Sequence, residues 1–427
     1  MITLYHQSGI VGGKWIPNSV PHNYRDSNSY NDGNYKSVKT KFISEICEYL
    51  DLPFEQVSPE TYKNNIAYYH IEVDWIDQAF VYRNVFEHID DRTMELIKKG
   101  NLRLLLWFPN EGFSLQMPRF IDIIDFCIKD LEIPLDKVYL VFGDLNIKNN
   151  YKLYAKQKGY VDINVYGMDS FESTYCKEIE MLESAGSYCI SQDEFLYHWK
   201  RPREKSFIFK NANPREQRIY FAAELKNRNL LDTAYYSWLN RYFIPDIENT
   251  SSLEKYCADK SKLPQLQKSL KEFFKNVPYI IDFNGHEIEQ DLNQRILVNY
   301  HFLNSYFSFV TETTYEDSWE EDVLFITEKT YQPIVNYHPF ITASQVDTLT
   351  YLKGNGYATF PELFDESYDN ELDVKKRSDI ILNSIQNFNK DIYFSDIIKD
   401  KLIHNRNLFF ERKGKDSWIK CFKWLER

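Results

Sequence analysis

Three features that would narrow the class of this protein are missing from its sequence. No stretch approaches the roughly 20 apolar residues that a membrane-spanning helix needs. The six cysteines form no CxxC pair and have no histidine at zinc-finger spacing, so we expect reduced thiols and no metal site. The first residues lack a basic region followed by a long apolar run, which argues against a secretory leader. The prediction is a soluble, cytoplasmic protein.

A positive charge excess is also missing. The formal net charge is −12 and the pI is near 5.4, which opposes a protein whose affinity comes from neutralising nucleic-acid phosphates. Hydrophobic residues make up 43% and aromatic residues 16% of the chain, and this composition is typical of a folded protein. At 427 residues, two domains of about 200 residues each are expected.

Short apolar runs alternate with helical spacing in the first half of the sequence. The runs cover residues 65–75, 102–109, 137–143 and 161–167, and residues 120–131 carry apolar side chains at helical spacing. This alternation predicts a parallel α/β sheet with helices as crossovers.

A second alternation begins after a basic, proline-containing stretch at 197–206, which suggests a boundary near residue 200. A helix is predicted at 216–231 and an inserted helical segment near 249–276, and the C-terminal residues also favour helices. Predicted strands of this half cover 206–211, 277–282, 305–312, 323–329 and 338–344. The resulting prediction is two Rossmann-like domains, 1–200 and 201–427, facing across a cleft, with ligands at the carboxyl ends of strands.

Two arginines mark a possible phosphate site in the second half. Arg215 and Arg218 follow a predicted strand and a proline-containing turn, where a helix begins. Helix N-termini attract anions, and a guanidinium adds bidentate recognition of phosphate. The alternative is that both arginines are solvated charges at a helix start.

A Thr-Glu-Lys sequence follows the predicted strand at 323–329. Thr327 can cap the next helix, which would place Glu328 and Lys329 in its first turn near the strand end. Pro333 would then lie beyond the positions that tolerate proline, so either a kink or a helix beginning nearer Thr330 is expected.

Three blocks of the second half, "NANPREQRIYFAAEL", "FSFVTET" and "LFITEKTYQPIVNYHPFI", resemble in order the donor-binding half of the α1,3-fucosyltransferase family. With the tail "FPELFDESYD", they also look like uncharacterised bacteriophage glycosyltransferases. The resemblance covers about 205–370 and implies a GT-B fold with the nucleotide sugar in the C-terminal domain. It implies that Arg218 and Lys329 bind the diphosphate, whereas Glu312 and Glu328 bind sugar or ribose hydroxyls. It suggests a GDP-linked donor, and a UDP-linked sugar fits the residues as well.

The first half carries no such resemblance, so a catalytic base is predicted from position. An acceptor hydroxyl must lose its proton during glycosyl transfer, and a carboxylate at a strand end can accept it. Glu111 is the first choice, followed by Glu72 and Asp74, whose acid-x-acid spacing would also suit a cation in a metal-dependent transferase.

The leading prediction is a glycosyltransferase that moves a sugar from a nucleotide-diphosphate donor to the hydroxyl of a glycan or another acceptor. Inversion without a bound metal or another cofactor is expected. One alternative is sugar transfer to modified bases of DNA, which the acidic net charge disfavours. The other is a non-catalytic nucleotide-sugar or carbohydrate-binding protein on the same fold.

Overall fold

The computed structural model divides the chain into two compact units. The first unit comprises Met1–Glu178, Asp317–Phe325 and Arg412–Arg427, and the second comprises Ile179–Glu316 and Ile326–Glu411. The first boundary thus lies at 178/179, whereas the sequence suggests one near 200, and two later segments return to the first unit. The structure describes residues 2–5, 10–11, 14–15, 43–57, 61–63, 66–72, 89–108, 112, 131–160, 162–184, 189–211, 214–238, 251–279, 299–315 and 323–427.

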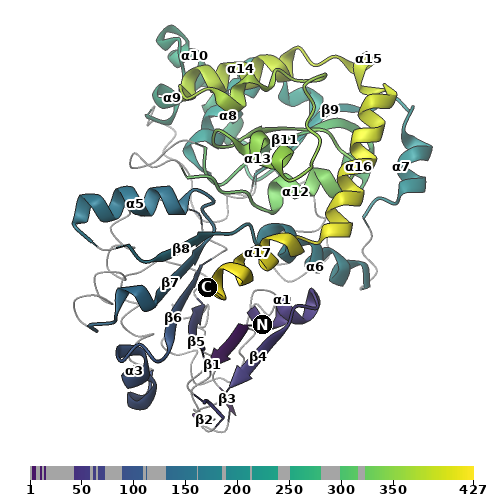
Figure 1. Cartoon of the computed structure of the whole chain (residues 1–427). Helices are drawn as coiled ribbons and strands as arrows, with labels where there is room; N and C mark the ends of the chain where they lie inside the picture. The colour runs from purple at the N-terminus through teal and green to yellow at the C-terminus, as the bar shows by residue number, and fades with distance from the viewer. Residues whose placement is uncertain are drawn as a thin grey trace. The chain divides into compact units, whose positions relative to one another are not determined.

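The first unit is built on a six-stranded parallel sheet in the order β4-β1-β5-β6-β7-β8 (Figure 1). The four apolar runs of the first half form β5 to β8, as predicted. A two-stranded antiparallel hairpin of β2 and β3 lies outside this sheet. The strands are β1 (Ile2–Tyr5), β2 (Ile10–Val11), β3 (Lys14–Trp15), β4 (Phe54–Val57), β5 (Tyr68–Glu72), β6 (Arg103–Phe108), β7 (Val138–Phe142) and β8 (Asn164–Gly167).

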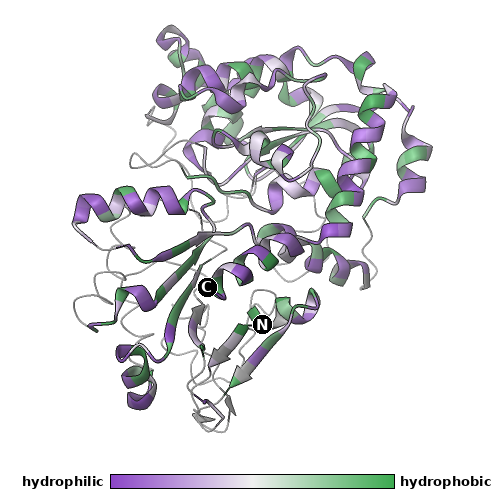
Figure 2. Ribbon diagram, viewed as in Figure 1, coloured by the Kyte–Doolittle hydropathy of each residue, from purple (hydrophilic) through white to green (hydrophobic). Residues whose placement is uncertain are grey.

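Helices cover both faces of this sheet because its central strands are apolar on both sides. On β6, Leu104 and Leu106 join a core with residues of α3 (Asp91–Lys98) and α5 (Ile147–Lys158). The alternate residues Leu105 and Trp107 pack in a second core with α1 (Ile43–Tyr49) and α17 (Lys415–Leu425). Figure 2 shows this pattern as hydrophobic β6 and β7 beside a largely hydrophilic α5. The last helix of the chain therefore completes the core of the first unit.

The second unit contains a four-stranded parallel sheet in the order β10-β9-β11-β12. The strands are β9 (Lys205–Asn211), β10 (Ala234–Trp238), β11 (Ser305–Thr311) and β12 (Phe340–Ala343). From β9 the chain passes to β10 on one side and later returns to β11 on the other side. The edge between β9 and β11 is thus a topological switch point, where ligands of such sheets bind.

Matching sequences on β9 and β11 build a ladder of aromatic pairs. Phe207 stacks on Phe307 with ring centroids 5.4 Å apart, and Phe209 stacks on Phe309 at 5.3 Å. Phe221 of α8 (Glu216–Asn227) closes over Phe309 in an edge-to-face contact at 5.0 Å. Alternate residues of neighbouring parallel strands share a face, so the ladder fixes which side chains meet at the carboxyl end.

Further helices surround the second sheet, and the inserted segment near 249–276 forms helices as predicted. The long helix α6 (Phe171–Ser184) starts in the first unit and ends in the second. Within the described ranges, no helix combines the length and apolar character that crossing a bilayer requires. The other helices that the structure describes are α7 (Gln192–His198), α9 (Ser251–Tyr256), α10 (Leu263–Phe274), α11 (Asn299–Leu303), α12 (Glu328–Val335), α13 (Thr348–Gly354), α14 (Val374–Gln386), α15 (Lys390–Tyr393) and α16 (Asp396–Arg412), with 3₁₀ turns at Leu135–Lys137, Leu231–Thr233, Lys260–Lys262 and Glu366–Asn370.

The α/β prediction with two parallel sheets is confirmed, whereas three local predictions are not. Residues 323–327 are buried without forming a strand, and β10 was not predicted. In the predicted strand 277–282, Tyr279 makes an isolated antiparallel bridge to Trp238. The predicted helix at 120–131 lies almost wholly outside the described residues. Five cysteines, Cys47, Cys176, Cys189, Cys257 and Cys421, are buried free thiols.

Candidate functional site

Polar side chains replace the aromatic ladder at the carboxyl ends of β9 and β11. Asn211 and Thr311 follow the stacked phenylalanines at alternate positions, and the Thr311 hydroxyl donates to Oδ1 of Asn211 at 2.7 Å. Both side chains are buried. The sheet edge at the switch point is therefore polar and ordered.

Glu312, the residue after β11, organises this edge from a fully buried position. Its side chain is 0% exposed, and its carboxylate accepts four hydrogen bonds. The hydroxyls of Thr327 and Thr330 each donate at 2.6 Å, and the backbone N–H groups of Thr327 and Thr313 donate at 3.2 Å. A sugar hydroxyl would compete with these four donors for the same carboxylate. The direct sugar contact expected of Glu312 does not fit this geometry, and Glu312 instead fixes the start of α12.

Thr327 caps α12 as predicted, because its hydroxyl oxygen accepts the backbone N–H of Lys329 at 3.4 Å. The helix begins at Glu328 and contains Pro333, so of the two predicted alternatives the later start near Thr330 is wrong. Nζ of Lys329 donates to the Thr327 hydroxyl at 3.1 Å and lies 2.9 Å from Oε1 of Glu328. The side chains of Lys329 and Glu328 are 32% and 21% exposed, so a ligand can reach both.

Two arginines lie at the start of α8, one exposed and one buried. Arg215 occupies the N-cap position and is exposed, whereas Arg218 is 4% exposed. Nη2 of Arg218 donates to the carbonyl oxygens of Thr311 at 3.1 Å and Glu312 at 3.4 Å, and Gln217 donates to the Glu312 carbonyl at 3.1 Å. Burial, and then the nearby charge of Arg215, lowers the pKa of Arg218 to about 10, although Glu312 and Glu328 oppose this shift.

The backbone that follows Glu312 is held from α14. The Tyr315 hydroxyl lies 2.8 Å from that of Ser378, and Arg377 donates to the Tyr315 carbonyl. Thr314 donates to Gln345 at 2.7 Å. The segment that joins β11 to the site is therefore fixed before any ligand arrives.

The acidic tail at 360–369 has a structural role. Asp369 accepts the N–H groups of Leu349 and Thr350 at 2.7 and 2.9 Å, at the start of α13. Glu366 accepts the N–H of Phe360 at 2.6 Å. These contacts stabilise the residues around β12 and α13. They explain the two acidic side chains without any contact to a ligand.

The structure thus brings together six residues that the sequence singles out: Arg215, Arg218, Glu312, Thr327, Glu328 and Lys329. It adds Asn211, Gln217 and Thr330, which sequence reasoning missed. A weak signal existed for Thr330, because a hydroxyl three residues after an N-cap threonine lies on the same side of the helix.

The structure describes no side chain of the three candidate bases of the first half. Glu111 and Asp74 lie outside the described residues. Glu72 is the last residue of β5 in the first unit, and only its backbone is described. In the described part of the chain, no group of three or more His, Cys, Asp or Glu side chains is arranged to hold a metal ion.

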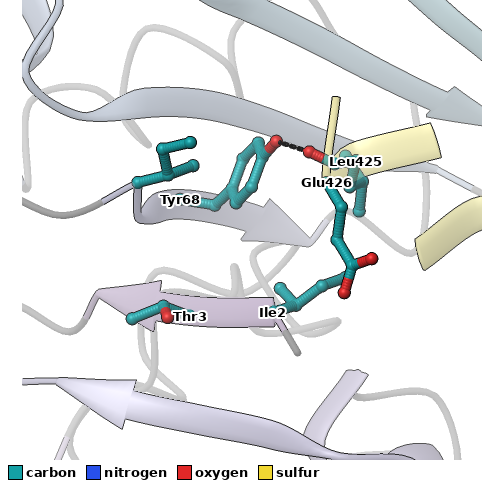
Figure 3. Close-up of a pocket in the computed structure, with 6 residues that line it drawn as sticks. Ile2, Thr3, Tyr68, Leu425 and Glu426 are labelled. Carbon is teal, nitrogen blue, oxygen red and sulfur yellow. Dashed lines mark hydrogen bonds between the residues drawn. The ribbon is translucent and has the colours of Figure 1, made fainter. Parts of the chain in front are cut away.

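A small pocket in the first unit is separate from these residues. It has a volume of about 180 Å³ and lies between β1, β5 and the end of α17, lined by Ile2, Thr3, Ile66, Tyr68, Leu425 and Glu426 (Figure 3). The Tyr68 hydroxyl and a guanidinium nitrogen of Arg103 both donate to the Leu425 carbonyl. These contacts tie the C-terminal end of α17 to β5 and β6.

Comparison with known proteins gives little further guidance. No model of a known protein family matches the sequence, and no curated protein matches it. Among solved structures, the chain is similar to an alpha,alpha-trehalose-phosphate synthase (UDP-forming) from Burkholderia vietnamiensis. The identity is 9% and the TM-score 0.40, over 89% of this chain and 76% of that one. At this level of similarity, the likeness assigns neither an activity nor a substrate.

Proposed function

We propose that the protein is a GT-B glycosyltransferase that binds a nucleotide-diphosphate sugar at the edge between β9 and β11. The observation that carries the proposal is the convergence of two helix N-termini and three cations on one polar sheet edge. Arg218 of α8 bonds to the carbonyls of Thr311 and Glu312, while the carboxylate of Glu312 holds the start of α12 beside Lys329. The resemblance of three ordered sequence blocks to glycosyltransferases supports the same site.

A diphosphate is the ligand chemistry that this edge suits. Helix N-termini carry partial positive charge and unpaired N–H groups, which favour phosphate. Burial, and then the charge of Arg215, lowers the pKa of Arg218, and a bound anion would offset both effects. During transfer, the departing nucleoside diphosphate gains negative charge, and fixed cations stabilise it.

The exposure of each side chain divides the roles. Exposed Arg215 and partly exposed Lys329 contact the phosphates, whereas buried Arg218 acts through its charge and by fixing the carbonyls beneath them. Glu328 neutralises Lys329 before the donor arrives and then accepts a hydrogen bond from a ribose or sugar hydroxyl. Glu312 is a positioning residue.

The acceptor half of the reaction remains a proposal from sequence. Glu111 is proposed as the base for the acceptor hydroxyl, and Glu72 or Asp74 are the alternatives. Transfer is proposed to invert the configuration at the anomeric carbon. The donor is proposed to be GDP-linked or UDP-linked, bound without a metal ion, and the acceptor a glycan or another hydroxyl compound.

The experiment is a thermal-shift screen of the purified chain against GDP, UDP, ADP, CMP and dTDP and their sugars, with and without EDTA. A ligand that binds only the native state raises the melting temperature. The proposal expects a selective shift that EDTA does not abolish, followed by release of the nucleoside diphosphate from its sugar when an acceptor is present. Binding without release would favour the non-catalytic alternative, and no shift with any nucleotide would remove the donor site.

A further inference from the structure

One short segment of the first unit is anchored through both of its central polar groups. In residues 323–325, the backbone N–H of Leu324 donates to Oδ1 of Asp144 at 3.0 Å. The Leu324 carbonyl accepts the backbone N–H of Leu145 at 2.9 Å. All three residues of this anchored segment are buried, so these hydrogen bonds are protected from water.

Asp144 is itself rigidly held. It follows β7 at the carboxyl end of the strand and is 1% exposed. Its Oδ1 also accepts the N–H of Asn146 at 2.9 Å, and its Oδ2 accepts Nδ2 of Asn150 at 2.7 Å. Asn146 and Asn150 lie at the start of α5, so the carboxylate of Asp144 links Leu324 to that helix through hydrogen bonds.

Phe325 provides a second anchor by close packing. Its ring contacts Phe171 edge to face at 5.5 Å. A Cβ atom added to Gly112 would lie 2.1 to 2.4 Å from atoms of Phe325, so only glycine leaves room for this ring. The segment is therefore fixed by a hydrogen-bonding clamp at Leu324 and by shape at Phe325.

The chain enters the second unit directly after this segment. Ile326 is the first residue of that unit, and the next residue, Thr327, caps α12 and donates twice to Glu312. Two residues can span at most about 7 Å. The N-terminus of α12 is thus held by Glu312, and the chain joins it directly to the segment anchored on Asp144.

We infer that Asp144, a residue of the first unit, is a positioning residue for the Thr327-Glu328-Lys329 turn. By fixing Leu324, it restricts the backbone that leads into the α12 cap. This role rests on the proposed function only where ligand binding is concerned; the restriction of the backbone stands without it.

The test is amide hydrogen exchange, followed by mass spectrometry, of peptides that cover 326–331. Asp144→Ala and Gly112→Ala should each speed exchange of these amides about tenfold, because each releases one of the two anchors. Asp144→Asn should give a smaller increase, since its remaining carbonyl oxygen can still accept the Leu324 N–H. The matched control is Ile97→Ala, a fully buried change in α3 of the same unit that lowers stability without touching the segment.

Equal exchange in Asp144→Ala and wild type, or an equal increase in Ile97→Ala, would overturn the inference. If Asp144→Ala fails to fold, Asp144→Asn and Gly112→Ala decide it. Affinity for GDP or UDP, measured on the same variants, separates the two proposals. If the wild-type protein binds no nucleotide, the proposed function is wrong. The exchange result still decides the role of Asp144.

Discussion

The Thr330 hydroxyl donates to a carboxylate oxygen of Glu312 at 2.6 Å, eighteen residues along the chain and entirely out of contact with water. With Thr327, it makes the buried carboxylate the anchor of the helix that carries Lys329. A threonine at each of these positions satisfies a charge that would otherwise be costly to bury. The Thr-Glu-Lys-Thr sequence therefore has two buried residues that hold the helix and two partly exposed residues that can meet a ligand.

Replacing Glu312 should lower the stability of the protein. Glu312→Ala leaves four donors, three of them buried, without their acceptor, which we expect to reduce the free energy of unfolding by about 3 kcal/mol. Glu312→Gln keeps one carbonyl oxygen and should lose less. Urea unfolding measures both, with the exposed Glu272→Ala in α10 as the control. A loss in Glu312→Ala no larger than in the control would contradict the anchoring role.

Lys329→Ala should weaken nucleotide binding without a comparable change in stability. The side chain is partly exposed and its partner Glu328 can be solvated, so the free energy of unfolding should change by less than about 1 kcal/mol. Affinity for the nucleoside diphosphate should fall at least tenfold, as expected when a charged hydrogen-bonding partner is truncated. Titration calorimetry compares it with Lys268→Ala, an exposed lysine of α10. Equal affinities in the two variants would remove Lys329 from the site.

The two arginines of α8 should separate in their effects. Arg215→Ala removes an exposed cation and should reduce nucleotide affinity while leaving the melting temperature nearly unchanged. Arg218→Ala removes a buried donor to two carbonyls, so it should lower both affinity and melting temperature. Thermal shift with and without nucleotide reads both quantities. The division of roles fails if Arg215→Ala is the more destabilised variant.

His338 should make the stability of the protein depend on pH. Burial, opposed by a hydrogen bond to the Ser305 carbonyl, lowers the pKa of His338 to about 3, whereas an unfolded histidine has a pKa near 6.5. The unfolded state therefore binds the extra proton first, so this stability is fully present above about pH 6.5 and is lost as the pH falls toward 3.

Between pH 7 and pH 5, wild type should lose about 2 kcal/mol more than His338→Gln, which cannot titrate. Urea unfolding at the two pH values provides the comparison. Parallel losses in both proteins would show that His338 is not the titrating group.

Much of the fold could be predicted because alternate apolar residues mark strands. The apolar sequences FIF and FSF predicted β9 and β11 correctly. The polar residues that end each run marked the carboxyl end of the strand, where the polar edge of the sheet lies. The N-cap role of Thr327 was also predictable, since hydroxyl capping is a local property.

The remaining features depend on contacts between distant residues. Residues 323–327 resemble a strand in composition, but their burial comes from Asp144, Phe171 and Glu312 rather than from a neighbouring strand. Glu312 looks like an available carboxylate in the sequence, and only the fold shows it enclosed. Trp418 packs on Trp107 across the core of the first unit, a pairing over 300 residues that no local pattern reveals.

The most direct measurement of the central claim is hydrogen exchange of the full chain with and without the nucleoside diphosphate that gives the largest thermal shift. The account predicts that protection on binding concentrates in peptides covering 214–220, 311–315 and 326–332, and that Lys329→Ala reduces it at the same nucleotide concentration. Protection confined to peptides of the first unit, or spread evenly over the chain, would contradict a donor site at the β9–β11 edge.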